Sequence, residues 1–239
     1  MFRKTLANKI SQRDDFRFRG SEVKRIEAFS DAVFAFAVTL LIVSLEVPRS
    51  FEELMNTMRG FVAFSVTFLL LMLIWYEQNI FFRRYGLDDL TTIILNCALI
   101  FLVLFYVYPL KFLFSLLFNN ANDSLSMTGT DSQKLMLIYG SGYICIYLLF
   151  LLMHIHAFRK KIELKLTPSE IFDTHTKIYK NTILVSIGVI SILFALLLKP
   201  ERSGLAGFVY FLIGPAFSLF FRYRGAKKNK LYNAAAEKN

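Results

Sequence analysis

The chain has 239 residues, of which 55% are hydrophobic and 19% are charged, against about 25% charged residues in an average soluble domain. Its apolar residues come in long blocks, which excludes a soluble globular protein. They predict an all-α integral membrane protein, because a helix satisfies its own backbone N–H and C=O groups within lipid. The net charge of +10 does not indicate a nucleic-acid partner, since membrane topology accounts for the basic residues.

Six apolar blocks predict six transmembrane helices. The second and sixth blocks are short for a hydrocarbon core, which takes about 20 residues to span. We expect these two to extend into their flanks or to bury part of their length against protein. In chain order, the predicted spans are Ile26–Val47, Phe61–Tyr76, Leu90–Phe114, Leu135–Phe158, Thr182–Leu198 and Leu205–Phe221.

Lysine and arginine are distributed unevenly among the connecting segments. Of the 28 basic residues, 22 lie in the N-terminal segment, in the loops after the second and fourth blocks, and in the C-terminal tail. Cytoplasmic loops carry the excess of basic residues in membrane proteins. The pattern therefore predicts an even number of spans, cytoplasmic N- and C-termini, and a multi-pass protein of the cell (plasma) membrane.

This topology divides the chain into three parts. A basic cytoplasmic segment (1–24) precedes a six-helix transmembrane domain (25–221), and a basic cytoplasmic tail (222–239) follows it. Before the fifth span, Thr167 and Glu170 have the spacing of the N-cap and N3 positions of a capping box, with a proline between them. A cytoplasmic helical extension is therefore expected to lead into the fifth span.

The first span contains carboxylates that lipid does not favour. Asp31 is followed by fourteen uncharged residues before Glu46 appears. An ionised aspartate at the centre of a membrane helix costs about 2.5–3.5 kcal/mol on insertion scales. Asp31 thus requires a partner from Ser30, from a loop or from another span, and the candidate donors there are the Trp75 indole and the Asn96 amide.

Two helix faces of the first span compete for the lining of an ion path. One is apolar with a hydroxyl in the middle and a carboxylate at its end, and it comprises Ala32, Phe36, Thr39, Val43 and Glu46. The other suits a plain packing seam and comprises Phe29, Val33, Phe36, Leu40, Val43 and Val47. Around a symmetry axis the first face would supply a hydrophobic gate, weak oxygen ligands and an acidic mouth. Periodicity alone favours ordinary helix packing.

The order of residues in this span is more specific than its periodicity. Arg25, followed after three residues by Phe29, Ser30 and Asp31 and then by "AVFAFAVTLLIVSLEVP", resembles the first helix of the transmembrane-protein-175 family of potassium channels. The likeness is closer to the prokaryotic six-span members. Weaker likenesses are Trp75 near the end of the second span, and Asn96 with Pro109 in the third.

The resemblance implies a homotetramer whose central pore is lined by the first helix of each subunit, with K⁺ as the permeant monovalent cation. It implies that Phe36 forms the narrowest hydrophobic ring, where the family usually has Ile or Leu, and that the Thr39 hydroxyl bears on cation selectivity. The expected ion pathway comprises Phe36, Thr39, Leu40, Val43 and Glu46. The expected motif and pore-helix support comprise Arg25, Phe29, Ser30, Asp31, Trp75 and Asn96.

Other candidate chemistry in the sequence is weak. His154 and His156 are two residues apart, so a helix directs them about 200° from each other, which disfavours a metal site. Cys97 and Cys145 lie in apolar blocks and are expected to be small buried hydrophobic residues. No nucleophile–base pair or phosphate-binding loop is present, so we expect no enzyme, no cofactor and no metal site.

The prediction is therefore a passive potassium-permeable channel in the lipid bilayer, with a hydrophobic constriction from the first helix. The alternative is a proton-coupled transporter or proton leak that uses the intramembrane carboxylates Asp31 and Glu46.

Overall fold

We describe the protein from a computed structural model, which covers residues 16–20, 22–43, 49–118 and 129–236. Every regular element in these ranges is helical, which confirms the all-α class. The elements are α2 (Arg25–Val43), α3 (Phe51–Tyr85), α4 (Leu90–Phe118), α5 (Gly129–Arg159), α6 (Pro168–Leu197), η2 (Pro200–Leu212) and α7 (Ile213–Ala236). They form two compact units, Met1–Thr128 and Gly129–Asn239.

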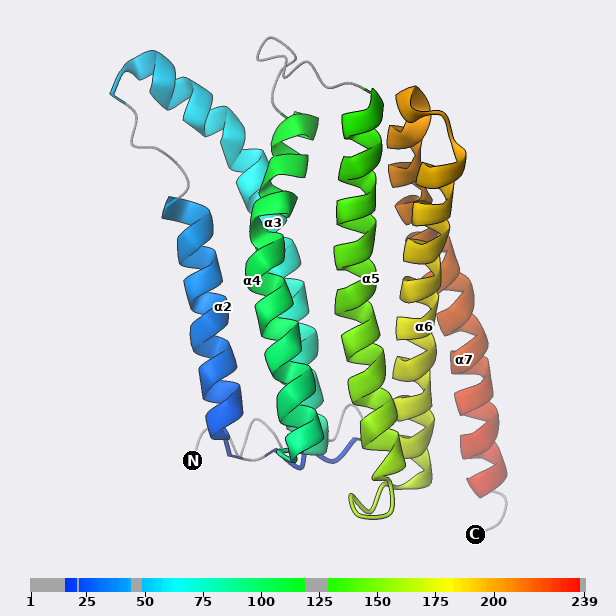
Figure 1. Ribbon diagram of the computed structural model, residues 1–239. Coiled ribbons are helices and arrows are strands. Elements are labelled where there is room, and N and C mark those ends of the chain that lie inside the picture. Colours follow the sequence, from blue (N-terminus) through cyan, green and yellow to red (C-terminus); the bar gives the residue numbers. More distant parts are fainter. Residues whose placement is uncertain (1–15, 21, 44–48, 119–128, 237–239) are drawn as a thin grey trace. The chain divides into compact units, whose positions relative to one another are not determined.

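In the first unit, α2, α3 and α4 each pack against the other two (Figure 1). Helix α3 is much longer than the predicted span Phe61–Tyr76. The Ser50 side chain caps its start by accepting a hydrogen bond from the Glu53 N–H, and Gly86 ends it in the left-handed conformation, with φ of 59°. The short second block therefore does extend into both of its flanks.

In the second unit, α5 and α6 pack against each other and against η2, and α7 contacts α6 and η2 (Figure 1). The predicted capping box is confirmed. The Thr167 side chain accepts a hydrogen bond from the Glu170 N–H, and the Glu170 carboxylate accepts one from the Thr167 N–H. The fifth span is thus entered by a helical extension that begins at Pro168.

The sixth predicted span, Leu205–Phe221, is not a single α-helix. It begins earlier, as the 3₁₀-helix η2, and continues as α7 into the predicted tail. In η2 the buried residues Ser203, Ala206 and Val209 are spaced by three, which is the period of a 3₁₀-helix. The Ser191 hydroxyl of α6 donates a hydrogen bond to the Ala206 carbonyl at 3.0 Å, so this small-residue face packs closely on α6.

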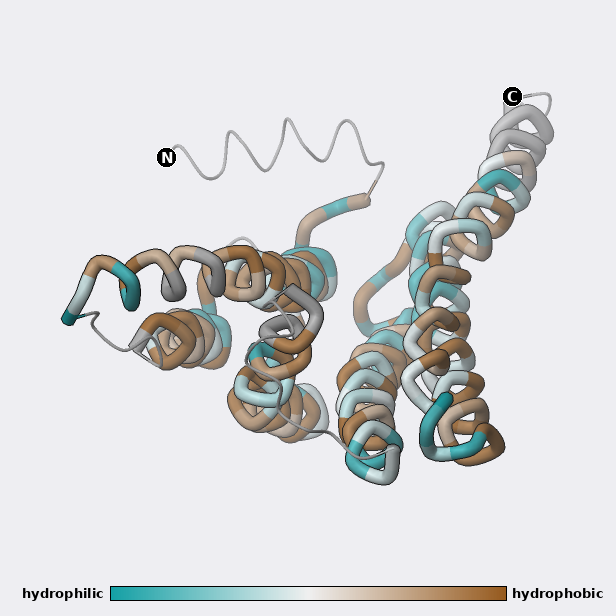
Figure 2. The backbone as a smooth tube through the Cα atoms, turned by 90° about the horizontal axis from the view of Figure 1, so that it is seen from above, coloured by the Kyte–Doolittle hydropathy of each residue, from teal (hydrophilic) through white to brown (hydrophobic). Residues whose placement is uncertain are grey.

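Within the residues that the structure describes, five helices are long and apolar enough to cross a membrane: Phe61–Tyr85, Leu90–Leu113, Gly129–Arg159, Pro168–Leu197 and Pro200–Ala226. Hydrophobic residues run along the helices of both units (Figure 2). Helix α2, with 19 residues, is not among the five. Six spans and the positions of the termini relative to the membrane therefore remain predictions.

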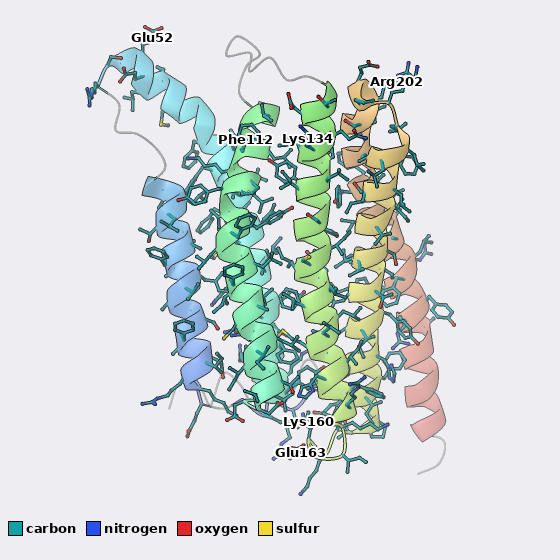
Figure 3. All side chains as sticks on the ribbon, viewed as in Figure 1. Glu52, Phe112, Lys134, Lys160, Glu163 and Arg202 are labelled. Carbon is teal, nitrogen blue, oxygen red and sulfur yellow. The ribbon has the colours of Figure 1, made fainter. Side chains whose placement is uncertain are left out.

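Charged side chains lie at the ends of the helices of the second unit. Figure 3 shows Lys134 and Arg202 at one end of this unit and Lys160 and Glu163 at the other. This separation follows from the alternating direction of α5, α6 and η2. It places Lys160 and Glu163, which lie in the connection between α5 and α6, at one end of these apolar helices.

The expectation that the two cysteines are buried is wrong, because Cys97 and Cys145 are both exposed on the protomer surface. An apolar block in a membrane helix is not evidence of burial within the chain. Side chains on such a helix can face lipid tails without the cost of exposing apolar surface to water.

Candidate pore helix and its supporting contacts

Helix α2 has one face that is buried in its own unit. The buried side chains recur every three or four residues and are Glu27, Ser30, Phe34, Ala37 and Leu41. This spacing is that of one helix face, and it is the face through which α2 packs on α3 and α4. The packing seam within the chain is therefore neither of the two stripes considered from the sequence.

The other face of α2 is exposed and carries the first of those stripes. Ala32, Phe36 and Thr39 are all exposed, with Phe36 at 56%. The competing stripe is mixed, since Phe29 is also 56% exposed whereas Val33 and Leu40 are half-buried. The chain itself covers little of the face that contains Phe36 and Thr39.

The Thr39 hydroxyl already has a donor role within its own helix. Its Oγ1 donates a hydrogen bond to the Ala35 carbonyl at 3.0 Å. Because a hydroxyl has one hydrogen and two lone pairs, the lone pairs of Oγ1 remain as acceptors on the exposed face. They are weak oxygen ligands of the kind that a hydrated cation can use.

The structure places only one of the last two residues of the expected ion pathway. Val43 is the last residue of the helix, and Glu46 lies outside the described residues. The predicted acidic mouth at Glu46 therefore remains a prediction.

Asp31 is held by a neighbouring helix. The Trp75 Nε1–H of α3 donates a hydrogen bond to Asp31 Oδ1, with 2.7 Å between the nitrogen and the oxygen. Trp75 was one of the two donors considered for Asp31. Asp31 itself is exposed in the protomer, so this bond lies where the buried and open faces of α2 meet.

Asn96, the other candidate donor, serves Ser30 instead of Asp31. Its Nδ2 donates a hydrogen bond to Ser30 Oγ at 2.7 Å, and the Ser30 hydroxyl in turn donates to the Ile26 carbonyl at 2.8 Å. Ser30 and Asn96 are both completely buried. A polar pair without access to water must be satisfied internally, and this pair joins α2 to α4.

The sequence reasoning missed Gln78, which completes this network. Its Nε2 donates a hydrogen bond to Asn96 Oδ1 at 2.6 Å, and its side chain is 2% exposed. Gln78 lies three residues after Trp75 and therefore on the same side of α3. It was missed because the predicted span ended at Tyr76, which assigned Gln78 to a loop.

The remaining motif residues, Arg25 and Phe29, lie on the exposed side of α2. Of the family motif, the structure thus brings Ser30 and Asp31 into contact with α3 and α4, while Arg25 and Phe29 project from the unit. The supporting network comprises Ser30, Asp31, Trp75, Gln78 and Asn96, and it secures the face opposite Phe36.

Comparison with known proteins gives a consistent result. A model of the family described as endosomal/lysosomal potassium channel TMEM175 matches residues 25–109, which include α2, α3 and most of α4. A protein of Marivirga tractuosa named potassium channel is 39% identical, over 96% of this chain and 98% of its own length. A potassium channel of Chamaesiphon minutus is 32% identical over 37% of this chain and 48% of its own.

Solved structures agree with these relatives. The crystal structure of a variant of the potassium channel MtTMEM175, in complex with a nanobody–MBP fusion protein, superposes with a TM-score of 0.79 at 38% identity and covers 88% of this chain and 97% of that one. A TMEM175 homologue from Chamaesiphon minutus has the same fold, with a TM-score of 0.55 at 21% identity over 82% of this chain and 95% of its own.

The relatives are named as channels, a non-enzymatic class, so the expectation that the chain is not an enzyme is confirmed. The identity to the Marivirga protein extends over nearly the whole length of both chains. The family-model match covers the helices that contain the motif and its supporting network. On these grounds the chain belongs to the TMEM175 family.

Proposed function

We propose that the protein is a passive potassium channel of the cell membrane, built as a homotetramer in which α2 of each subunit lines a central pore. The support for a potassium channel comes from relatives and solved structures that are named as such. In this proposal α2 is the first of six membrane spans of each subunit, both termini are cytoplasmic, and lipid surrounds the assembly.

The observation that carries the assignment of the pore helix is the two-sided character of α2. Its buried face is fixed by packing and by hydrogen bonds from Trp75 and Asn96, whereas Phe36 on the opposite face is 56% exposed. A helix anchored on one side, with an apolar ring and a hydroxyl on the other, suits the lining of a pore. Hydrophobic constrictions close such pores by excluding water.

In the proposed pore, Phe36 forms the constriction, and Thr39 lies one helical turn further along the same face. Leu40 and Val43 continue the apolar wall, and Glu46 attracts cations at its end. Four phenylalanine rings around an axis are bulkier than the Ile or Leu usual in the family, so we expect the constriction to limit conduction. Ring faces also attract cations.

The first prediction concerns the size of residue 36. In liposomes with an outward K⁺ gradient, Phe36→Ala is expected to increase K⁺ flux per protein by about tenfold or more, because it widens and wets the constriction. Phe101→Ala on α4 is the matched control, since Phe101 is also an exposed phenylalanine, at 72%, but lies on another helix. Its flux should equal that of the wild type.

Two outcomes count against the proposal. Absence of K⁺ flux above that of protein-free vesicles, in both the wild type and Phe36→Ala, argues against a channel. A flux that is carried by protons and is lost in Asp31→Asn argues for the alternative, a proton-coupled transporter or leak through Asp31 and Glu46.

A further inference from the structure

The segment that precedes α2 is packed against the end of α3. We name residues 16–20 and 22–24 the N-terminal strap. Phe16 of the strap is completely buried, its ring meets the Tyr85 ring edge-on at 5.6 Å, and the Arg84 guanidinium lies 4.8 Å from its centroid. The Gly20 N–H donates a hydrogen bond to the Arg83 carbonyl at 3.0 Å. The strap therefore satisfies part of the C-terminal end of α3.

Two glycines allow the backbones to come this close. A Cβ on Gly20 would lie 2.6 Å from the Phe82 carbonyl oxygen, and a Cβ on Gly86 would lie 3.1 Å from the backbone of Arg19 and of Gly20. Gly86 also has φ of +59°, which side chains rarely adopt. The position of the strap on α3 is thus fixed by direct contact between main chains.

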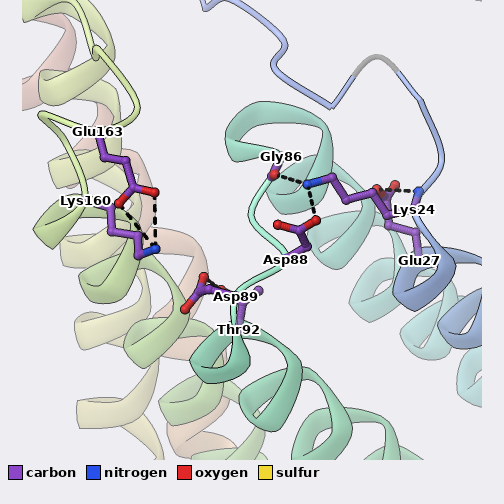
Figure 4. Close-up of polar contacts among 8 residues, drawn as sticks. All are labelled: Lys24, Glu27, Gly86, Asp88, Asp89, Thr92, Lys160 and Glu163. Atoms are coloured by element: carbon purple, nitrogen blue, oxygen red, sulfur yellow. Dashed lines mark hydrogen bonds and ion pairs between the residues drawn. The ribbon is translucent and has the colours of Figure 1, made fainter.

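Lys24 joins the strap to three parts of the first unit (Figure 4). Its Nζ donates a hydrogen bond to the Gly86 carbonyl at 2.6 Å and lies 2.9 Å from Asp88 Oδ2. Its backbone N–H donates to Glu27 Oε1, in the first turn of α2, at 3.3 Å. An ammonium group at the C-terminal end of α3 also meets the negative end of the helix dipole. Lys24 thus connects the end of α3, the α3–α4 connection and the start of α2.

We propose that Lys24 is a positioning residue for α2. By fixing the start of α2 to the α3–α4 connection, it sets the orientation in which the face with Phe36 meets the pore. The inference rests on the proposed function, because it assumes that α2 lines the pore. Lys24 itself lies outside the predicted ion path, and it acts through the two helical turns between it and Asp31.

The same geometry separates positioning from stability. The side chains of Lys24 and Asp88 are 32% and 64% exposed, and an ion pair of that exposure contributes little to folding. Breaking the pair is therefore expected to leave the protein folded and assembled, while the orientation of α2 becomes less restricted.

The test compares Lys24→Met, Asp88→Asn and the double variant in reconstituted vesicles. We expect both single variants to have a lower K⁺ flux per protein than the wild type. The flux of Lys24→Met should be about threefold below that of the wild type, because the conducting orientation of α2 loses population. The double variant should have the same flux as Lys24→Met, because the Asp88→Asn change removes no further interaction once the Lys24 ammonium is absent. Flux equal to the wild type in Lys24→Met, or losses that simply add, would overturn the proposal.

The control is the ion pair of Lys160 with Glu163, which is 3.3 Å long and also partly exposed but lies in the connection between α5 and α6 (Figure 4). Lys160→Met and Glu163→Gln should conduct as the wild type does. A fall in flux in these two variants equal to that in Lys24→Met would show a general effect of lost surface charge and would also overturn the proposal.

A second readout does not depend on conduction. Trp75 is the single tryptophan of the chain, and its indole contacts Asp31 of α2. If Lys24 positions α2, Lys24→Met should shift the fluorescence emission maximum of Trp75 in vesicles, and Lys160→Met should not. Unchanged emission in Lys24→Met overturns the positioning role. Should neither the wild type nor Phe36→Ala carry K⁺ flux, the proposed function fails, and the emission alone decides about Lys24.

Discussion

Asn96 connects the three helices of the first unit through one side chain. Its Oδ1 accepts a hydrogen bond from Gln78 on α3, and its Nδ2 donates one to Ser30 on α2. All three side chains are nearly or completely buried, so none of them can replace a lost partner with bulk water. An amide that satisfies both neighbours also fixes the rotation of α2 about its axis.

At this scale we predict that Asn96→Leu destabilises the protein by about 1–3 kcal/mol, because it leaves the Gln78 amide and the Ser30 oxygen without their partner. The thermal unfolding midpoint of the detergent-solubilised protein measures the effect. Cys97→Leu is the matched control, since Cys97 is the next residue on α4 and is exposed. Equal midpoints for the two variants would contradict the structural role of Asn96.

At the scale of elements, α6 begins at Pro168, well before the predicted span Thr182–Leu198, and a capping box stabilises this start. The Thr167 hydroxyl accepts from the Glu170 N–H at 3.3 Å, and Glu170 is almost completely buried at 1% exposure. We predict that Thr167→Ala loosens the first turn by about 1 kcal/mol. Faster hydrogen exchange of the amides of residues 169–171 measures it.

Thr182→Ala is the control for this prediction, because the Thr182 hydroxyl bonds the Ile178 carbonyl in mid-helix and caps nothing. Exchange in the first turn should be unchanged in this variant. If Thr167→Ala also leaves that exchange unchanged, the capping box does not stabilise the start of α6.

The 3₁₀ form of η2 could not be predicted from composition, since the same apolar residues are compatible with an α-helix. Tertiary contacts distinguish the 3₁₀-helix from an α-helix here. The Ser191 hydroxyl on α6 bonds the Ala206 carbonyl, and small buried residues recur with a period of three. The capping box of α6, by contrast, depends on residues three apart in the sequence, and it was predicted correctly.

For the whole molecule we predict four subunits. The mass of the protein in detergent, measured by light scattering with the detergent subtracted, should equal four copies of the 27.7 kDa chain. Phe36→Ala provides a control for this measurement, because Phe36 makes a constriction in the proposal and does not hold subunits together. A strictly monomeric wild type would leave α2 without an axis to line.

The fold class and the approximate helices followed from sequence, because the length of an apolar block is a local property. The need of Asp31 for a partner also followed, but the sequence left Trp75 and Asn96 both open as donors, and only the structure selects Trp75. Gln78 and the strap around Phe16 did not follow. Both depend on where α3 ends, and its end at Gly86 lies well beyond the apolar block. The faces of α2 were also ambiguous, because Phe36 belongs to both stripes.

The separation of the two faces of α2 has a consequence for how this protein can diversify. Ser30 and its hydrogen-bond partners lie on the side away from Phe36, so a change in the size of residue 36 leaves this network intact. In the proposed pore, a change of residue at that one position would alter permeation and leave the network that anchors α2 in place.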